Sequence, residues 1–116
     1  MKFTIDREVE FVPEWNENRK ADEPIKFTLK YLTGPERDDI VNLAFDAEGK
    51  VSVKPNFVKA CKVGIKKIEG LTVDGKQITT ADEFLKIPGF DDLYHELGNQ
   101  IMTMNPIKDE ALKNSG

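Results

Sequence analysis

The residue types that can do chemistry gather first in the stretch "KKIEGLTVDGKQITTADEFLKIPGF", residues 66–90. It mixes carboxylates, lysines and threonines, as a metal-binding or reactive loop would. The segment "DGKQITTADE" resembles a calcium loop, but it lacks the oxygen ligands at alternate positions that an EF-hand requires. The glycine spacing of a Walker phosphate loop is also absent. The stretch therefore predicts a hairpin turn and a helix start, and no ion or phosphate site.

The second cluster surrounds His95, the single histidine of the chain. Asp91 and Asp92 precede it by four and three residues, so on a helix one carboxylate would share its face. A histidine oriented by a carboxylate is one part of a general base. With Glu96, these residues do not reproduce the spacing of a tetrahedral zinc site. Apolar residues at helical spacing explain the segment by packing, so we expect a surface histidine.

The candidate nucleophiles lack the neighbours that would activate them. Cys61 is the only cysteine, which excludes an intrachain disulfide and a CxxC metal knuckle. Its apolar neighbours in "FVKACKVGI" predict a small buried thiol. Ser52 and Ser115 lack the glycine pattern of a nucleophile elbow. We therefore expect no catalytic residue, metal or cofactor, and a protein that acts by binding or assembly and is not an enzyme.

The composition of the chain narrows the expected number of domains and the expected binding partners. The chain has 116 residues, of which 39% are hydrophobic and 33% are charged, and this suits one domain with a modest core. A net charge of -4 disfavours nonspecific binding to nucleic acid, which depends on clustered Lys and Arg. No apolar run reaches the roughly 18 residues that span a bilayer, and the alternating start is unlike a signal peptide. We expect a cytoplasmic protein that binds neither nucleic acid nor membrane.

Alternating hydrophobicity predicts strands at the start of the chain. Residues 3–11 place apolar side chains at alternate positions, interrupted by Arg7, and residues 25–31 alternate without a break. Pro13 ends the first strand, and a polar loop follows. We expect Trp15 in this loop to fold back onto the core, with an exposed binding anchor as the alternative.

Capping signals predict helices farther along. Thr33 and Thr80 are each followed three residues later by glutamate, which is the capping-box pattern. The apolar spacing carries the first of these helices to Ala44, and Pro88 ends the second. A last helix begins at Asp91 and ends before "NP" at residues 105–106.

The middle of the chain, residues 51–71, is ambiguous. We expect a short helix at about residues 55–62 and a strand at residues 63–68. Asp74–Gly75 is a strong signal for a two-residue hairpin turn. The fold is therefore predicted as α+β, with a small antiparallel sheet of N-terminal strands and a central hairpin, packed against three or four helices. We expect residues 1–105 to form a single domain and residues 106–116 a polar C-terminal tail, whose flexibility stays open.

The order of these folding signals resembles the tail assembly chaperones of long-tailed bacteriophages. Those proteins often end with a run similar to "IEGLTVDGKQIT", a capped helix, and a helix like "FDDLYHELGNQIMTMNPI". Their start is similar to "PIKFTLKYLTGPERDDI". The resemblance lies mostly in the second half of the chain, and its motifs are turns, caps and apolar positions, with no catalytic signature.

The resemblance implies a non-enzymatic protein of the bacterial host cytoplasm. It would coat the tape measure protein, keep it soluble, and help recruit tail tube subunits; formation of a homo-oligomer stays open. A long helical client suits recognition in a groove. Our own candidates for protein-binding contacts are Trp15, Tyr94, Ile101 and Met104. The alternative is that they pack in the core, which is the better interpretation for Ile101.

The resemblance also raises a hypothesis about the end of the gene. In this family a ribosomal frameshift there commonly extends part of the product, and Leu112–Asn114 can be encoded by codons on which ribosomes slip.

Two alternative functions stay open. A phage tail-completion or head-tail connector structural protein is the first alternative function. A bacterial adaptor domain unrelated to phage is the second.

Overall fold

The computed structural model describes residues 1–45 and 47–109, and a three-stranded antiparallel sheet lies at its centre. The strand order is β2 (Glu8–Phe11), β3 (Lys26–Lys30) and β6 (Ile65–Glu69). β3 is the middle strand because it pairs on both edges. The fold is α+β, as the order of sequence signals predicts.

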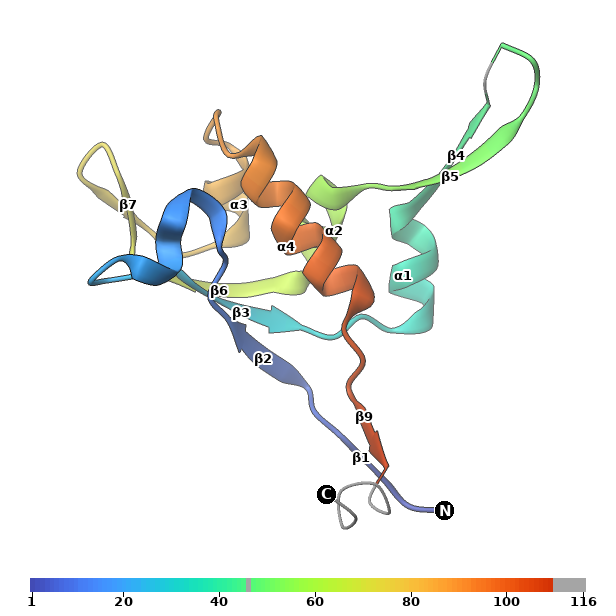
Figure 1. Ribbon diagram of the computed structural model, residues 1–116, viewed down its shortest axis with the longest axis horizontal. Helices are drawn as coiled ribbons and strands as arrows, with labels where there is room; N and C mark the ends of the chain where they lie inside the picture. Colours follow the sequence, from blue (N-terminus) through green and yellow to red (C-terminus); the bar gives the residue numbers. More distant parts are fainter. Residues whose placement is uncertain (46, 110–116) are drawn as a thin grey trace.

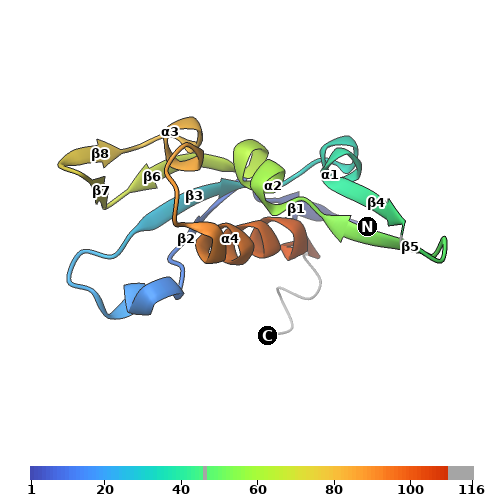
Figure 2. The same cartoon turned by 90° about the horizontal axis from the view of Figure 1, so that it is seen from above.

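Helices cover the sheet and close the core. α2 (Phe57–Gly64) contacts β3 and β6, and α4 (Asp91–Thr103) packs chiefly on α2 (Figures 1 and 2). The fully buried Phe27 and Leu29 of β3 occupy alternate positions and so share one face. The buried hydrophobic core comprises Phe27, Leu29, Leu32, Ile40, Ala60, Cys61, Ile65, Ile68, Leu71, Ile78, Phe84, Leu93, Tyr94, Leu97 and Ile101.

The capped helices and the hairpin turn form where the sequence predicts them. α1 (Gly34–Ile40) has a complete capping box at Thr33, and α3 (Ala81–Leu85) begins at a Thr80 side chain that caps it. Between α2 and α3, the short strands β7 (Leu71–Val73) and β8 (Lys76–Ile78) form a hairpin.

The hairpin turn has the backbone that its two residues favour. Asp74 and Gly75 both have positive φ, 51° and 78°. Two successive residues with positive φ make a type I′ turn, for which Asp-Gly is a preferred pair.

The polar loop after β2 contains a short 3₁₀ segment, η1 (Trp15–Lys20). Buried Asn18 holds it in place, because its side-chain nitrogen donates to the Pro13 and Ile25 carbonyls at 3.0 Å each, and its oxygen accepts from the Ile25 N–H at 2.7 Å. Trp15 is half-buried against the core, as expected.

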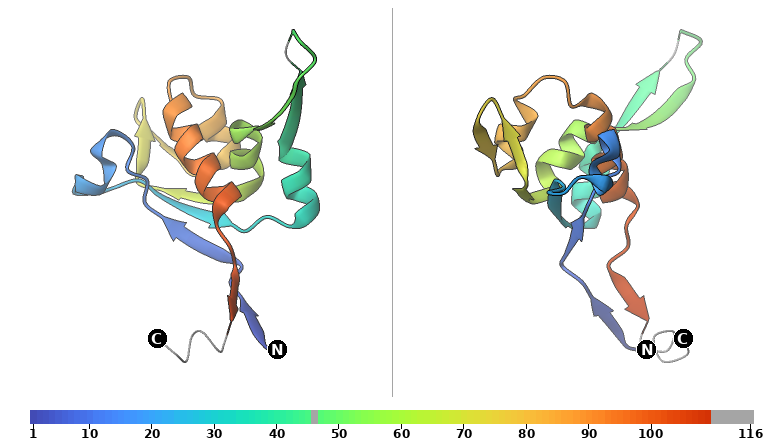
Figure 3. Two further views of the ribbon diagram at one scale, coloured as in Figure 1. Left: turned by 45° about the vertical axis from the view of Figure 1, so that its right-hand side comes forward. Right: turned by 60° about the vertical axis from the view of Figure 1, so that its left-hand side comes forward.

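Two ribbons of paired strands stand away from the body (Figures 1 and 3). The hairpin arm consists of β4 (Val41–Phe45) and β5 (Val51–Pro55). The terminal arm consists of β1 (Phe3–Ile5) and β9 (Ile107–Asp109), which brings the two ends of the described chain together. Both ribbons are two-stranded and antiparallel.

The prediction of one continuous strand over residues 3–11 is wrong. The chain changes partners at Asp6 and Arg7: the Asp6 N–H donates to the Pro106 carbonyl at 3.2 Å, while the Arg7 carbonyl accepts from Tyr31 N–H at 3.4 Å. β1 therefore pairs with β9, and β2 pairs with β3.

The expected extension of the first helix to Ala44 is also wrong, because the helix ends at Ile40. Residues 41, 43 and 45 are apolar and lie two apart, and residues 51 and 53 are apolar with polar residues after each. This spacing matches a ribbon as well as a helix. The Asn56 N–H closes the base of the arm by donating to the Ile40 carbonyl at 3.0 Å.

Residues 107–109, at the start of the predicted C-terminal tail, are paired with β1 in β9. Residues 110–116, including the Leu112–Asn114 segment, lie outside the described residues. Over the described ranges, the helices are too short or too polar to cross a membrane.

Candidate functional site

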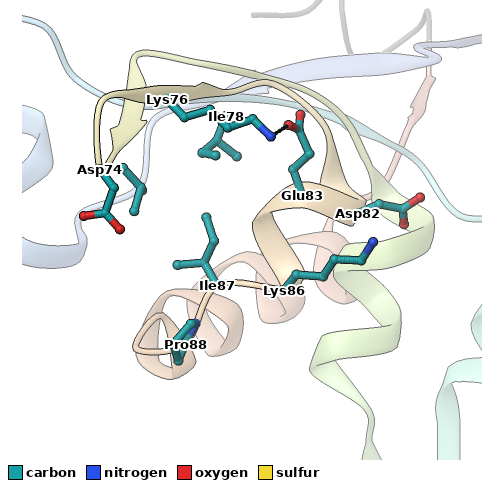
Figure 4. Close-up of a pocket in the computed structure, with 9 residues that line it drawn as sticks. Asp74, Lys76, Ile78, Asp82, Glu83, Lys86, Ile87 and Pro88 are labelled. Carbon is teal, nitrogen blue, oxygen red and sulfur yellow. Dashed lines mark ion pairs between the residues drawn. The ribbon is translucent and has the colours of Figure 1, made fainter.

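A cleft of about 630 Å³ lies between the β7–β8 hairpin and α3, in the stretch that first suggested a reactive loop. Ile78 and Ile87 point toward one another across it, and charged side chains stand at its rim (Figure 4). Its lining consists of Val73, Asp74, Lys76, Ile78, Asp82, Glu83, Lys86, Ile87 and Pro88.

The carboxylate of Glu83, which lines this cleft, already makes an ion pair and hydrogen bonds within the protein. Lys76 Nζ lies 3.0 Å from Glu83 Oε2, and the Thr80 hydroxyl donates to Oε1 at 3.1 Å. The Thr79 N–H and hydroxyl also donate to Oε1. Lys76, then the Thr79 N–H, then the Thr80 hydroxyl lower the pKa of Glu83 to about 2. Glu83 therefore pairs with Lys76 and accepts hydrogen bonds from Thr79 and Thr80 at the start of α3. A carboxylate with so low a pKa is a poor general base.

The lowered pKa of Glu83 predicts a pH-dependent contribution to stability. Because the folded pKa is about 2 and the ordinary value is near 4.3, the stabilisation is complete above pH about 5 and is lost as the pH falls toward 2. We expect Glu83→Gln to have a lower melting temperature than the parent at pH 7, with a difference that shrinks on acidification. Thermal unfolding followed by circular dichroism from pH 7 to pH 2 measures this difference.

Glu23→Gln is the control for this prediction, because Glu23 is exposed and lies outside the cleft. Its melting curve should follow the parent at every pH. A Glu83→Gln difference that stays constant down to pH 2 would contradict the assignment.

A second groove, of about 570 Å³, runs beside the first turns of α4. It forms where β5 leads into α2, because the Asn56 side chain caps α2 by accepting from Lys59 N–H at 3.0 Å. Val58, in the first turn of α2, is 49% exposed there. The groove is lined by Lys54, Pro55, Asn56, Phe57, Val58, Asp91, Tyr94 and His95.

His95 lies on the surface, as its sequence context predicts. Its ring is 4.8 Å from the ring of Phe57, so it forms part of the groove wall by packing. Across residues 1–45 and 47–109, no three histidine, cysteine, aspartate or glutamate side chains are placed to hold a metal ion together. The groove therefore offers a ligand the rings of Phe57 and His95 together with the charged side chains that share its lining.

Cys61 is a fully buried thiol, as predicted. Its sulfur lies 3.7 Å from the Tyr94 carbonyl, to which it donates. Burial raises the pKa of Cys61 to about 12. The thiolate is the nucleophilic form of cysteine, so this residue is inert at neutral pH.

The structure does not gather the four predicted contact residues on one exposed surface. Ile101 is fully buried and Tyr94 is 7% exposed, so both belong to the core, although Tyr94 also contributes to the groove lining. Trp15 packs edge-on against Phe90, with ring centres 5.5 Å apart. Met104 is half-buried at the end of α4.

The groove residues Phe57 and Val58 were missed as binding candidates by sequence reasoning. The sequence signal that could have identified them is Asn56, a residue type that commonly caps helices. Its cap fixes where α2 begins, and hence which residues fall in the first, outward-facing turn.

Comparison of this chain with protein-family models, with curated proteins and with solved structures found no match. The interpretation of the two grooves and the two arms therefore rests on their own geometry and chemistry.

Proposed function

We propose that this protein is a non-enzymatic tail assembly chaperone of a long-tailed bacteriophage. In this proposal it acts in the cytoplasm of the bacterial host, binds the tape measure protein, and helps recruit tail tube subunits. The observation that supports it is the groove beside α4, in which Phe57 and Val58 offer apolar contact area to a partner.

The groove suits an amphipathic helix as its client. Phe57 and Val58 supply apolar contact area, and half of Val58 is open to solvent. Lys54 and Asp91 are exposed residues of opposite charge in the same lining, and they would pair with polar groups that flank the apolar stripe of a helix. Apolar residues at i, i+3, i+4 and i+7 are the usual anchors in this mode of recognition.

A structural subunit, such as a tail-completion or head-tail connector protein, is the second candidate. The two projecting arms favour it, because they carry exposed apolar side chains that a subunit of a permanent assembly would cover. Mass spectrometry of purified virions separates the two functions: a chaperone leaves the finished tail, and a connector stays in it.

Co-expression with the tape measure protein of the same phage, the client that this proposal implies, tests the chaperone function. We expect that protein to stay soluble only when this chain is present. Val58→Asp places a charge in the groove and should weaken binding by at least about tenfold, the effect expected for a buried interface contact. Binding is measured by titrating the labelled client fragment and reading its fluorescence anisotropy.

Lys62→Asp is the matched control, because Lys62 is an exposed residue of the same helix that does not line the groove. It should bind the client as the parent does. A client that is equally soluble without this chain, or a Val58→Asp variant that binds like the parent, would refute the proposal.

A further inference from the structure

Exposed apolar side chains concentrate on the two arms. The described residues expose eight large hydrophobic side chains, and apart from Val58 all of them belong to an arm or directly precede it. Those on or beside the arms are Met1, Phe3, Ile5, Phe45, Val51, Val53 and Ile107. Exposed apolar patches on a folded protein mark places where something else binds.

The hairpin arm has one apolar face. Phe45 lies directly opposite Val51, and Val53 is two residues farther along the same strand, so the three side chains point to the same side. They are 70%, 56% and 63% exposed respectively. A lone two-stranded ribbon is at best marginally stable in water, so a cover over this face would stabilise it.

The terminal arm repeats the arrangement. Ile5 lies opposite Ile107, and Phe3 is two residues from Ile5 on the same face. These side chains are 53%, 52% and 49% exposed. The chain thus carries two ribbons of the same kind, each with an uncovered apolar face of similar size.

We propose that the arms cover one another between two copies of this chain. The hairpin arm of each copy packs on the terminal arm of the other, in a dimer with two-fold symmetry. Figure 1 shows the hairpin arm rising above α1 and the terminal arm descending below it, so both flank the α1 side of the molecule. A two-fold axis on that side brings each arm to the opposite kind of arm, and two-fold dimers are the commonest closed assemblies.

The exposed apolar area of the arms indicates whether the dimer has one arm-to-arm contact or two. From the exposed fractions of its three apolar side chains, each arm offers roughly 300 Å². A single arm-to-arm contact would bury roughly 600 Å² in total, which is the size of a weak packing contact. Two reciprocal contacts would bury roughly 1,200 Å², the lower limit for a specific interface. The area therefore requires that both arms of each copy take part.

Sedimentation velocity over a wide range of protein concentration tests the dimer. We expect the parent to be dimeric, and Phe45→Ser with Val53→Thr to raise the dimer dissociation constant by at least about tenfold. Ile5→Thr with Ile107→Thr, on the other arm, should have the same effect. Val58→Thr, an exposed apolar site outside the arms, should leave the dimer intact. Circular dichroism of each variant checks that the body is folded.

Single-cysteine probes test which arms meet. Val53→Cys chains and Ile107→Cys chains, treated with a short bismaleimide crosslinker, should form dimers only when the two are mixed. The native Cys61 does not interfere, because it is fully buried. A parent that is monomeric at every concentration overturns the proposal. So does a terminal-arm variant that dimerises like the parent, or crosslinking of Val53→Cys to itself.

Discussion

Replacing Phe84 by alanine should lower the free energy of unfolding by about 3–5 kcal/mol, the range for truncating a buried aromatic residue. Phe84 is fully buried where α3 meets β6 and α2. Its ring centre lies 5.4 Å from that of Phe27 on β3 and 5.1 Å from that of Tyr94 on α4. A third ring, that of Phe90, is 5.3 Å away. The truncation would leave a cavity bordered by all three rings.

The same cavity would weaken a hydrogen bond that ties α4 to the end of α3. The Tyr94 hydroxyl lies 3.2 Å from the Phe84 carbonyl and 3.0 Å from the Ile87 carbonyl, and it donates to this pair of acceptors. Urea unfolding followed by Trp15 fluorescence measures the loss, because Trp15 packs against Phe90 in the folded state.

Phe84→Leu is the matched control, since it keeps most of the volume and should cost about 1–1.5 kcal/mol. A loss below about 1 kcal/mol for Phe84→Ala would mean that the site collapses around the missing ring. The aromatic cluster would then not be the centre of the core.

Features set by a few neighbouring residues were predictable from the sequence. The Thr33 and Thr80 caps need only a side chain within reach of an N–H three residues on. The turn at Asp74–Gly75 needs only two residues that tolerate positive φ. In each case the signal and the structure it specifies occupy the same few positions.

The arms were not predictable, because their strands depend on partners elsewhere in the chain. Phe3 pairs with Asp109, and nothing near Phe3 signals that partner. Residues 41–45 carry a pattern that suits a helix or a strand, and the pairing with residues 51–55 decides between them.

The burial of the candidate contact residues on α4 also depends on a partner far along the chain. Periodicity identifies the apolar stripe of a helix, yet it does not say which part of the stripe meets another helix. α4 meets α2, so Ile101 is buried, while Phe57 and Val58 of α2 are left to line the groove.

The strand β5 links the two proposals. Its apolar residues Val51 and Val53 lie on the hairpin arm, and its last residue, Pro55, lines the groove. The two proposals are nevertheless tested separately, since Val58→Asp changes only the groove and Phe45→Ser changes only the arm. A dimer without client binding would support an assembly subunit.

Gly98→Val should lower the free energy of unfolding by about 2–3 kcal/mol, the upper part of the range for overpacking a core. Gly98 lies inside α4, where it faces α2. A Cβ atom at this position would lie 2.7 Å from Phe57 Cβ and 2.9 Å from Phe57 Cα. Since one of these is a backbone atom, no rotamer change of Phe57 can make room, and the helices must separate. Valine has only slightly better helix propensity than glycine, so it offsets little of this cost.

Four further substitutions show whether backbone contact is the cause. The atoms nearest to a Cβ at Gly64 would all belong to the Ile101 side chain, the closest at 2.7 Å. In a double-mutant cycle, Ile101→Ala should therefore reduce the loss of stability caused by Gly64→Ala. Phe57→Ala removes the ring atom Cδ1, which would also lie 2.7 Å from a Cβ at Gly98, but it keeps Cα and Cβ. It should therefore relieve the destabilisation by Gly98→Val only in part. At Gly34 a Cβ would meet no atom within 4 Å, and Gly34→Ala should be neutral or stabilising. Urea unfolding measures all of these variants. Complete relief of Gly98→Val by Phe57→Ala would show that the ring, and not the helix backbone, sets the distance between α2 and α4.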